Sequence, residues 1–194
     1  MGISTVTKVQ RPWIAAIVVA LLQTIVLGYL IATRAAILAY GADVLLKTAP
    51  VDPRDLLRGD YVTLHYDISR VPLATLVGDR PENAANRVLF VRLQRRQDGF
   101  WSVAESSFSP LSAKQDTVIL KTMPLTYQPL EGQEAIQVDY GIERYYVPEG
   151  KGHDLEGAPM SGRISVAARV SSGGAAQIRS LMRDGQPVYD EPLF

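Results

Sequence analysis

The side chains that could do chemistry gather in two parts of the sequence. Arg54, Asp60, Tyr61 and His65 lie within 12 residues of one another, and Glu149 stands in a later loop rich in glycine. On a strand that begins at Tyr61, the side chains of Tyr61 and His65 share one face. If the other three residues converge there, the five would form an exposed polar surface able to bind a ligand. They are the candidate binding residues of this chain.

The same stretch also has a purely structural interpretation. The opposite face of the predicted strand, at alternate positions from 62 to 68, is apolar apart from one hydroxyl. Leu64 and Tyr66 are therefore expected in the core, where the Tyr66 hydroxyl needs one hydrogen-bond partner. Gly59 and Asp60 would form the turn into the strand, because glycine adopts backbone angles closed to other residues and aspartate accepts from nearby N–H groups.

Patterns typical of enzymes and metal sites are few. The chain has no cysteine, which excludes disulfides, thiolate metal sites and a cysteine nucleophile. The metal candidate is His153 with Asp154 and Glu156, but a calcium site requires more carboxylates at ordered spacing. No glycine-rich stretch follows a strand and opens a helix, as nucleotide-binding motifs do. We expect no metal, no cofactor and no catalytic residue, and a solvated loop at His153.

A run without charge near the N-terminus predicts a membrane anchor. Residues 13–33 contain no charged side chain, and as a helix they would extend about 31 Å, enough to cross the hydrocarbon core and contact lipid. Residues 1–40 are therefore predicted to be a tail and a single transmembrane anchor. A buried core helix and a signal peptide cleaved near Ala39-Tyr40-Gly41 are the alternatives.

The charges beside the span predict its orientation. Lys8 and Arg11 precede it, Arg34 and Lys47 follow it, and no acidic residue occurs before Asp43. With the terminal amine added, the positive charge favours an N-terminus in the cytoplasm. The soluble domain would then lie outside the cytoplasm.

Residues 41–194 are predicted to form one soluble, mostly β domain. About nine short strands separated by turn signals are typical of an antiparallel β sandwich or an open barrel. One strand is expected over residues 61–69 and another over residues 117–127, and a hairpin turn is expected at Gln97-Asp98-Gly99.

The charge of this domain argues against nucleic acid as a partner. All 20 acidic residues lie within it and three of the 20 basic residues precede it, which leaves a formal charge of −3. Arg92, Arg95 and Arg96 form a small basic cluster on the predicted hairpin. A solvated strand edge is the expected explanation, and a phosphate site is the alternative.

One motif carries a family resemblance. Residues 59–66, GDYVTLHY, fit G-D-Y-x-x-L-x-Y at every fixed position, and the chain resembles the GDYXXLXY family of bacterial membrane-anchored proteins. The run from Tyr146 to Gly152, with Pro148, Glu149 and Gly150, is also similar to the family pattern. The resemblance implies an N-terminal membrane segment and a multi-pass membrane protein as partner, but no particular activity. With the orientation expected above, it implies the inner membrane of a bacterium and a soluble domain on the periplasmic side.

A weaker similarity concerns residues 53–62, which resemble the P-x-L-x-x-G-D-x-V run of signal-peptidase-type serine proteases. Their serine nucleophile has no counterpart, because Val51 and Asp52 stand at the matching positions. Lys47 and Lys114 are outside the expected pattern for the base, and the two groups must lie within hydrogen-bond reach.

Three hypotheses follow from the sequence. The first is a non-catalytic β domain that acts as an accessory or interaction module for a membrane protein. The second is a signal-peptidase-like hydrolase scaffold without activity. The third is an envelope sensor that binds a small molecule between the strand after Tyr61 and the loop at residues 148–162.

Overall fold

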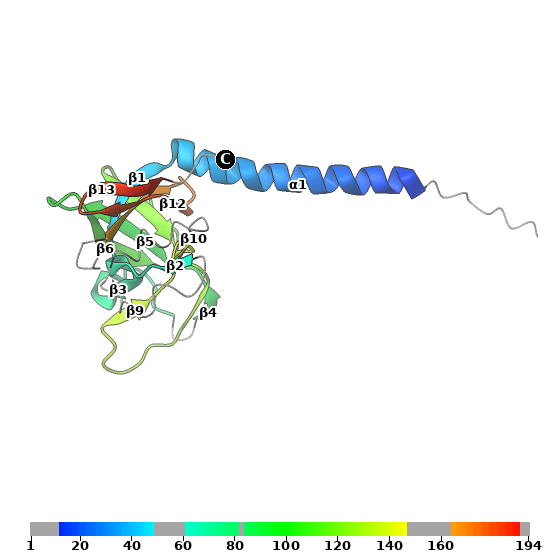
Figure 1. Cartoon of the computed structure of the whole chain (residues 1–194). Coiled ribbons are helices and arrows are strands. Elements are labelled where there is room, and N and C mark those ends of the chain that lie inside the picture. Colours follow the sequence, from blue (N-terminus) through cyan, green and yellow to red (C-terminus); the bar gives the residue numbers. More distant parts are fainter. Residues whose placement is uncertain (1–11, 49–60, 82–83, 147–163, 191–194) are drawn as a thin grey trace, which may run out of the picture.

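The computed structural model describes residues 12–48, 61–81, 84–146 and 164–190 (Figure 1). A long helix leads into β-strands that share one core. All pairs of named strands in this described part are antiparallel, and the sheets do not close into a barrel there. The mostly β fold predicted from the sequence is confirmed, while the boundary at residue 40 stays a prediction.

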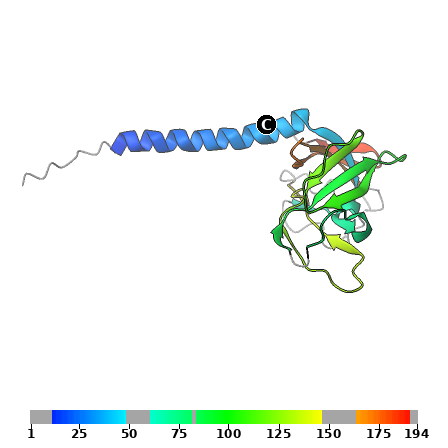
Figure 2. The ribbon, with the colours of Figure 1, turned by 180° about the vertical axis from the view of Figure 1, so that it is seen from behind.

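The helix α1 (Pro12–Tyr40) contains the predicted charge-free span and continues past it. At about 1.5 Å per residue it extends about 44 Å. Within Trp13–Tyr40, an 18-residue window has a mean hydropathy of 2.5, so this helix is long and apolar enough to cross a membrane. All side chains from residue 13 to residue 34 are exposed, and both views show α1 standing away from the strands (Figure 2). The alternative of a buried core helix is therefore wrong.

Gly41 ends α1, as predicted. Its N–H donates to Ile37 O at 2.8 Å, and the chain then enters β1 (Ala42–Lys47) directly. A Cβ at position 41 would lie 3.0 Å from the backbone nitrogen of Val170 and 3.1 Å from the Cβ of Arg169. The missing side chain thus lets the end of the helix approach the sheet closely.

The largest sheet has four strands in the order β1-β11-β12-β13 and adjoins the end of α1 (Figure 1). The other three strands are β11 (Ile164–Val170), β12 (Ala176–Arg183) and β13 (Gln186–Asp190). Buried and less buried side chains alternate along β1, where Val44 and Leu46 face the core. This alternation follows from the two-residue period of a strand.

A second sheet has three strands in the order β6-β5-β7 and is drawn in green in Figure 2. Its strands are β5 (Phe90–Arg95), β6 (Trp101–Ser107) and β7 (Thr117–Lys121). The predicted turn joins β5 to β6: Gly99 has a φ of +85°, and the Phe100 N–H donates to Asp98 Oδ1 at 3.1 Å. Glycine suits this turn because its backbone reaches positive φ without steric cost.

The remaining strands form three short pairs. They are β2 (Tyr61–Thr63) with β10 (Arg144–Tyr146), β3 (Arg70–Pro72) with β9 (Ala135–Gln137), and β4 (Ala84–Arg87) with β8 (Leu125–Tyr127). The predicted strand over residues 117–127 is thus two strands, β7 and β8, with Pro124 between them. Proline lacks the N–H that a continuous ladder would use.

Two of these pairs are parts of one interrupted ribbon. Tyr61 lies opposite Tyr146 in the first pair, and Pro72 lies opposite Ala135 in the second. From Tyr61 to Pro72 the first segment advances by 11 residues, and from Tyr146 back to Ala135 the second segment recedes by the same number. The register is the same on both sides of residues 64–69, although the strand ladder stops there.

The prediction of one continuous strand over residues 61–69 is wrong for this reason. β2 ends at Thr63, and residues 67–69 form a turn of 3-10 helix, η1 (Asp67–Ser69). Between them, the backbone of Tyr66 forms an antiparallel bridge with Thr48, which follows β1. At Tyr66, Thr48 therefore takes the place of the other segment of the ribbon as the backbone partner. A second such turn, η2 (Leu73–Thr75), follows β3.

One hydrophobic core connects the sheets. Its fully buried members come from the four-stranded sheet, the three-stranded sheet and the ribbon, and include Leu46, Val71, Leu93, Leu120 and Val166. Burying a side chain of this size contributes roughly 1.5–3 kcal/mol. The core therefore holds the two larger sheets together without a disulfide.

Gly174 fastens the turn between β11 and β12 to the edge of β7. Its carbonyl accepts from the Lys121 N–H at 2.9 Å, and its φ is +87°. A Cβ there would lie 3.1 Å from Lys121 N and 3.2 Å from Ile119 O. Only glycine fits both the backbone angle and the space.

Replacing Gly174 by alanine should therefore destabilise the domain more than Gly99→Ala does. Gly99 also has positive φ, but nothing lies within 4 Å of the position of its Cβ. Gly99→Ala should cost about 1 kcal/mol in backbone strain, and Gly174→Ala about 1–3 kcal/mol more because of the contact with β7. Denaturant unfolding of the full chain in detergent measures both, and equal losses would contradict the docking of this turn.

Candidate functional site

The two motif residues predicted to be structural lie in the core, so that prediction is confirmed. Leu64 and Tyr66 are both almost fully buried. The Leu64 N–H donates to Glu143 O at 2.7 Å, and the Tyr66 hydroxyl donates to Ile142 O at 2.6 Å. The hydroxyl thus has the one partner that a buried tyrosine needs.

A second tyrosine makes the reverse contact. The Tyr140 hydroxyl donates to Ile68 O at 2.8 Å, so each segment of the ribbon sends one phenol to a backbone carbonyl of the other. Both bonds are buried and lie where the strand ladder is interrupted. They satisfy carbonyl groups that would otherwise lose hydrogen bonds on folding.

Glu143 fixes the turn that carries Tyr140. Its carboxylate oxygens accept from the Tyr140 N–H and from the Gly141 N–H, the latter at 2.8 Å. Burial raises the pKa of Tyr66 and of Tyr140 well above the ordinary value, and the nearby Glu143 charge raises both further. Both phenols are therefore fixed as neutral donors, which suits structural hydrogen bonds and does not suit proton transfer near neutral pH.

The predicted binding residues are brought together only in part. His65 is exposed, on the side of the chain opposite the buried Leu64 and Tyr66. Tyr61 belongs to β2 and pairs with Tyr146, the first residue of the second segment that resembles the family pattern. Outside the described residues lie Arg54, Gly59, Asp60, Pro148, Glu149 and Gly150, so their convergence stays a prediction.

A cavity of about 210 Å³ lies next to the motif segment. Asp67 and Ile68 of η1 form one wall, and Lys47 at the end of β1 forms another. The rest comes from β3 and from the β5–β6 hairpin, including Arg70 and Trp101. Sequence reasoning missed this site because its residues come from three separate segments of the chain, and no motif connects those segments.

The basic cluster predicted on the hairpin edge is only partly exposed. Arg95 and Arg96 are exposed, but Arg92 is 2% exposed and lies on the middle strand of its sheet. The explanation as a solvated edge is therefore wrong for Arg92. Its position in β5, between β6 and β7, makes it a buried charge that must be paired.

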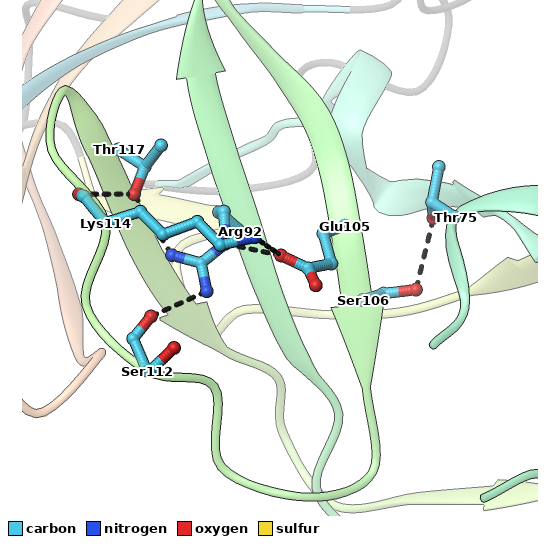
Figure 3. A network of polar contacts seen from close by, with 7 residues as sticks. All are labelled: Thr75, Arg92, Glu105, Ser106, Ser112, Lys114 and Thr117. Carbon is cyan, nitrogen blue, oxygen red and sulfur yellow. Dashed lines mark hydrogen bonds and ion pairs between the residues drawn. The ribbon is translucent and has the colours of Figure 1, made fainter. Parts of the chain in front are cut away.

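Arg92 is the centre of the polar network in Figure 3. Its Nε lies 2.7 Å from Glu105 Oε2, Nη1 donates to Thr117 Oγ1 at 3.1 Å, and Nη2 donates to Ser112 O at 2.6 Å. The hydrogen bonds from Arg92 and Lys114 lower the pKa of Glu105. The network ties the loop between β6 and β7 to the sheet.

Lys114 belongs to the same network, with its Nζ 3.0 Å from Glu105 Oε2 (Figure 3). The Lys114 ammonium is thus held in an ion pair with the Glu105 carboxylate. Among the described residues no cluster of three or more His, Cys, Asp or Glu side chains could hold a metal ion. The metal candidate with His153, Asp154 and Glu156 lies outside them.

This geometry defines a class of protein. Its members have an apolar helix followed by a mostly antiparallel β domain, with a buried L-x-Y segment in the core. The sequence model described as GDYXXLXY protein matches residues 23–181, and the chain belongs to this family. The resemblance carried by residues 59–66 is thereby confirmed. Comparison with curated proteins finds no match, and comparison with solved structures finds none either.

Tyr66→Phe should destabilise the domain by about 1–3 kcal/mol, because the substitution leaves the buried Ile142 carbonyl without its donor. Tyr40→Phe is the matched control, since Tyr40 is 88% exposed and loses no buried partner. Thermal and denaturant unfolding of the full chain in detergent compare the two. A Tyr66→Phe variant as stable as the Tyr40→Phe control would show that the hydroxyl contributes nothing.

Proposed function

We propose that this chain is a membrane-anchored accessory protein whose non-catalytic β domain is positioned beside a multi-pass membrane protein. The observation that carries the proposal is the direct connection of an exposed apolar helix to a folded domain. α1 and β1 are separated only by Gly41. A helix joined in this way holds the domain close to the membrane surface and to any protein bound by the helix.

Contacts at the end of α1 support a rigid connection. Leu38 is buried, and Arg169 Nη1 of β11 donates to Gly41 O at 2.8 Å. Arg169 Nε also lies 2.7 Å from Asp43 Oδ1, and Arg179 Nη1 lies 3.4 Å from the same oxygen. The Asp43 side chain is exposed, so the ion pairs themselves contribute little, about 0–1 kcal/mol each. The close packing at Gly41 is the stronger restraint.

One face of α1 has the composition of a helix–helix contact in a membrane. Small residues recur at every fourth position, namely Ala16, Ala20, Thr24, Gly28 and Ala32. Such spacing lets two helix backbones approach closely. Gln23, one turn from Ala20, is exposed on the same side and could hydrogen-bond to a partner helix in the apolar membrane.

The location we propose is the inner (cytoplasmic) membrane of a bacterium, with the β domain on the periplasmic side. The support is the pair of basic residues and the terminal amine before the span, together with the lack of acidic residues before Asp43. Residues 13–33 would contact lipid, and residues 35–40 would connect the bilayer to the domain. The ion pair between Lys114 and Glu105 and the two neutral, buried tyrosines support a non-catalytic role.

Gly28→Leu should weaken recovery of the membrane partner about tenfold, since the added side chain separates the two helices. In the chain itself nothing lies within 4 Å of a Cβ at position 28, so the fold should be unaffected. Val26→Leu is the matched control, because position 26 lies about 200° around the helix from position 28. The measurement is affinity purification of the full chain from membranes in mild detergent, with the co-purified proteins quantified.

Recovery of an integral membrane protein with the parent chain and with Val26→Leu, but not with Gly28→Leu, is the expected result. If no membrane protein is recovered with the parent chain, the accessory role loses its support. If both variants recover the partner equally, α1 is an anchor alone.

A further inference from the structure

Five of the 11 residues that line the cavity beside the motif segment are charged. Lys47, Arg70 and Arg96 supply three positive charges, and Asp67 and Asp98 supply two negative charges. They come from the end of β1, from η1 and β3, and from the turn between β5 and β6. The fold thus brings together charges that lie up to 51 residues apart in the sequence.

The two negative charges offset part of the positive charge, and 3 − 2 leaves the lining with a formal charge of +1. The Asp98 carboxylate is directed to its own turn, where Oδ1 accepts from the Phe100 N–H at 3.1 Å. Across the described ranges, Lys47, Arg70 and Arg96 form no side-chain hydrogen bond and no ion pair. Three cations around one hollow, none of them paired within the part of the chain that the structure describes, and a net positive lining create a potential that attracts an anion.

An aromatic wall lies beside these cations. Trp101 is half-buried, because it packs against the core as well as lining the cavity. Val103 and the buried Ile68 add apolar surface. A few polar groups on an otherwise apolar wall are typical of small-molecule sites. The volume of about 210 Å³ is below the roughly 300 Å³ at which sites for drug-sized ligands begin.

We propose that this cavity binds a small molecule that carries one carboxylate or phosphate group on a planar apolar body. Lys47, Arg70 and Arg96 hold the anionic oxygens, and Trp101 contacts the apolar body. Carboxylate and phosphate share the oxygen geometry that a guanidinium recognises. This site is distinct from α1, so its test is independent of the proposed membrane partner.

Trp101 provides a direct signal for this binding. The chain has two tryptophans, so Trp13→Phe in the full chain in detergent leaves Trp101 as the single tryptophan, whose emission is followed with excitation selective for tryptophan. Benzoate and phenyl phosphate are the probes, and benzyl alcohol is the neutral control of similar shape. Saturable binding of one or both anions and none of the alcohol is expected, with the two anions distinguishing a carboxylate site from a phosphate site. Calorimetric titration of the same samples detects binding whether or not the emission changes.

Substitutions separate the cavity from general surface charge. Arg70→Gln should weaken binding of the anion about tenfold, the typical effect of removing one charge-assisted hydrogen bond, and Lys47→Gln is a second variant of the same kind. Arg87→Gln is the matched control, because Arg87 is exposed and does not line the cavity. The proposal is overturned if neither anion binds, if benzyl alcohol binds equally well, or if Arg87→Gln weakens binding as much as the cavity variants.

Discussion

This β domain depends on two reciprocal hydrogen bonds, which the hydroxyl groups of Tyr66 and Tyr140 donate across the ribbon. Each hydroxyl donates to a carbonyl of the opposite segment, at Ile142 and Ile68. The backbone ladder of the ribbon is interrupted at this place, because Tyr66 pairs with Thr48 instead. The two phenols connect β2 and β10 to β3 and β9 across that interruption, and so preserve one register over the whole ribbon.

This arrangement explains why the motif identifies the family without identifying an activity. Leu64 fills the core and Tyr66 satisfies a buried carbonyl, so both act through packing. The approach of β1 to the interruption also brings the end of the four-stranded sheet against the ribbon. The two sites that we propose lie outside this framework, at the cavity lined by Lys47 and Arg70 and along the exposed face of α1.

Local patterns in the sequence were sufficient for the helix, the hairpin at Asp98-Gly99 and the burial of Leu64 and Tyr66. Periodicity could not predict the break after Thr63, because that break depends on the distant residue Thr48. The same limit applies to Arg92, whose partners Glu105 and Ser112 become neighbours only when the sheet forms. The cavity likewise depends on the fold, because its lining residues are distant in the sequence and no sequence motif connects them.

Hydrogen exchange at the two edges of the interruption tests the central claim most directly. The Leu64 N–H donates to Glu143 O and the Val138 N–H donates to Ser69 O, one on each side of the tyrosine pair. If the phenols hold the ribbon as one unit, both amides should exchange within about tenfold of the slowest amides of β11, which is paired on both sides. Exchange of either amide about a thousandfold faster than β11 would show that the interruption opens locally, and would contradict this account.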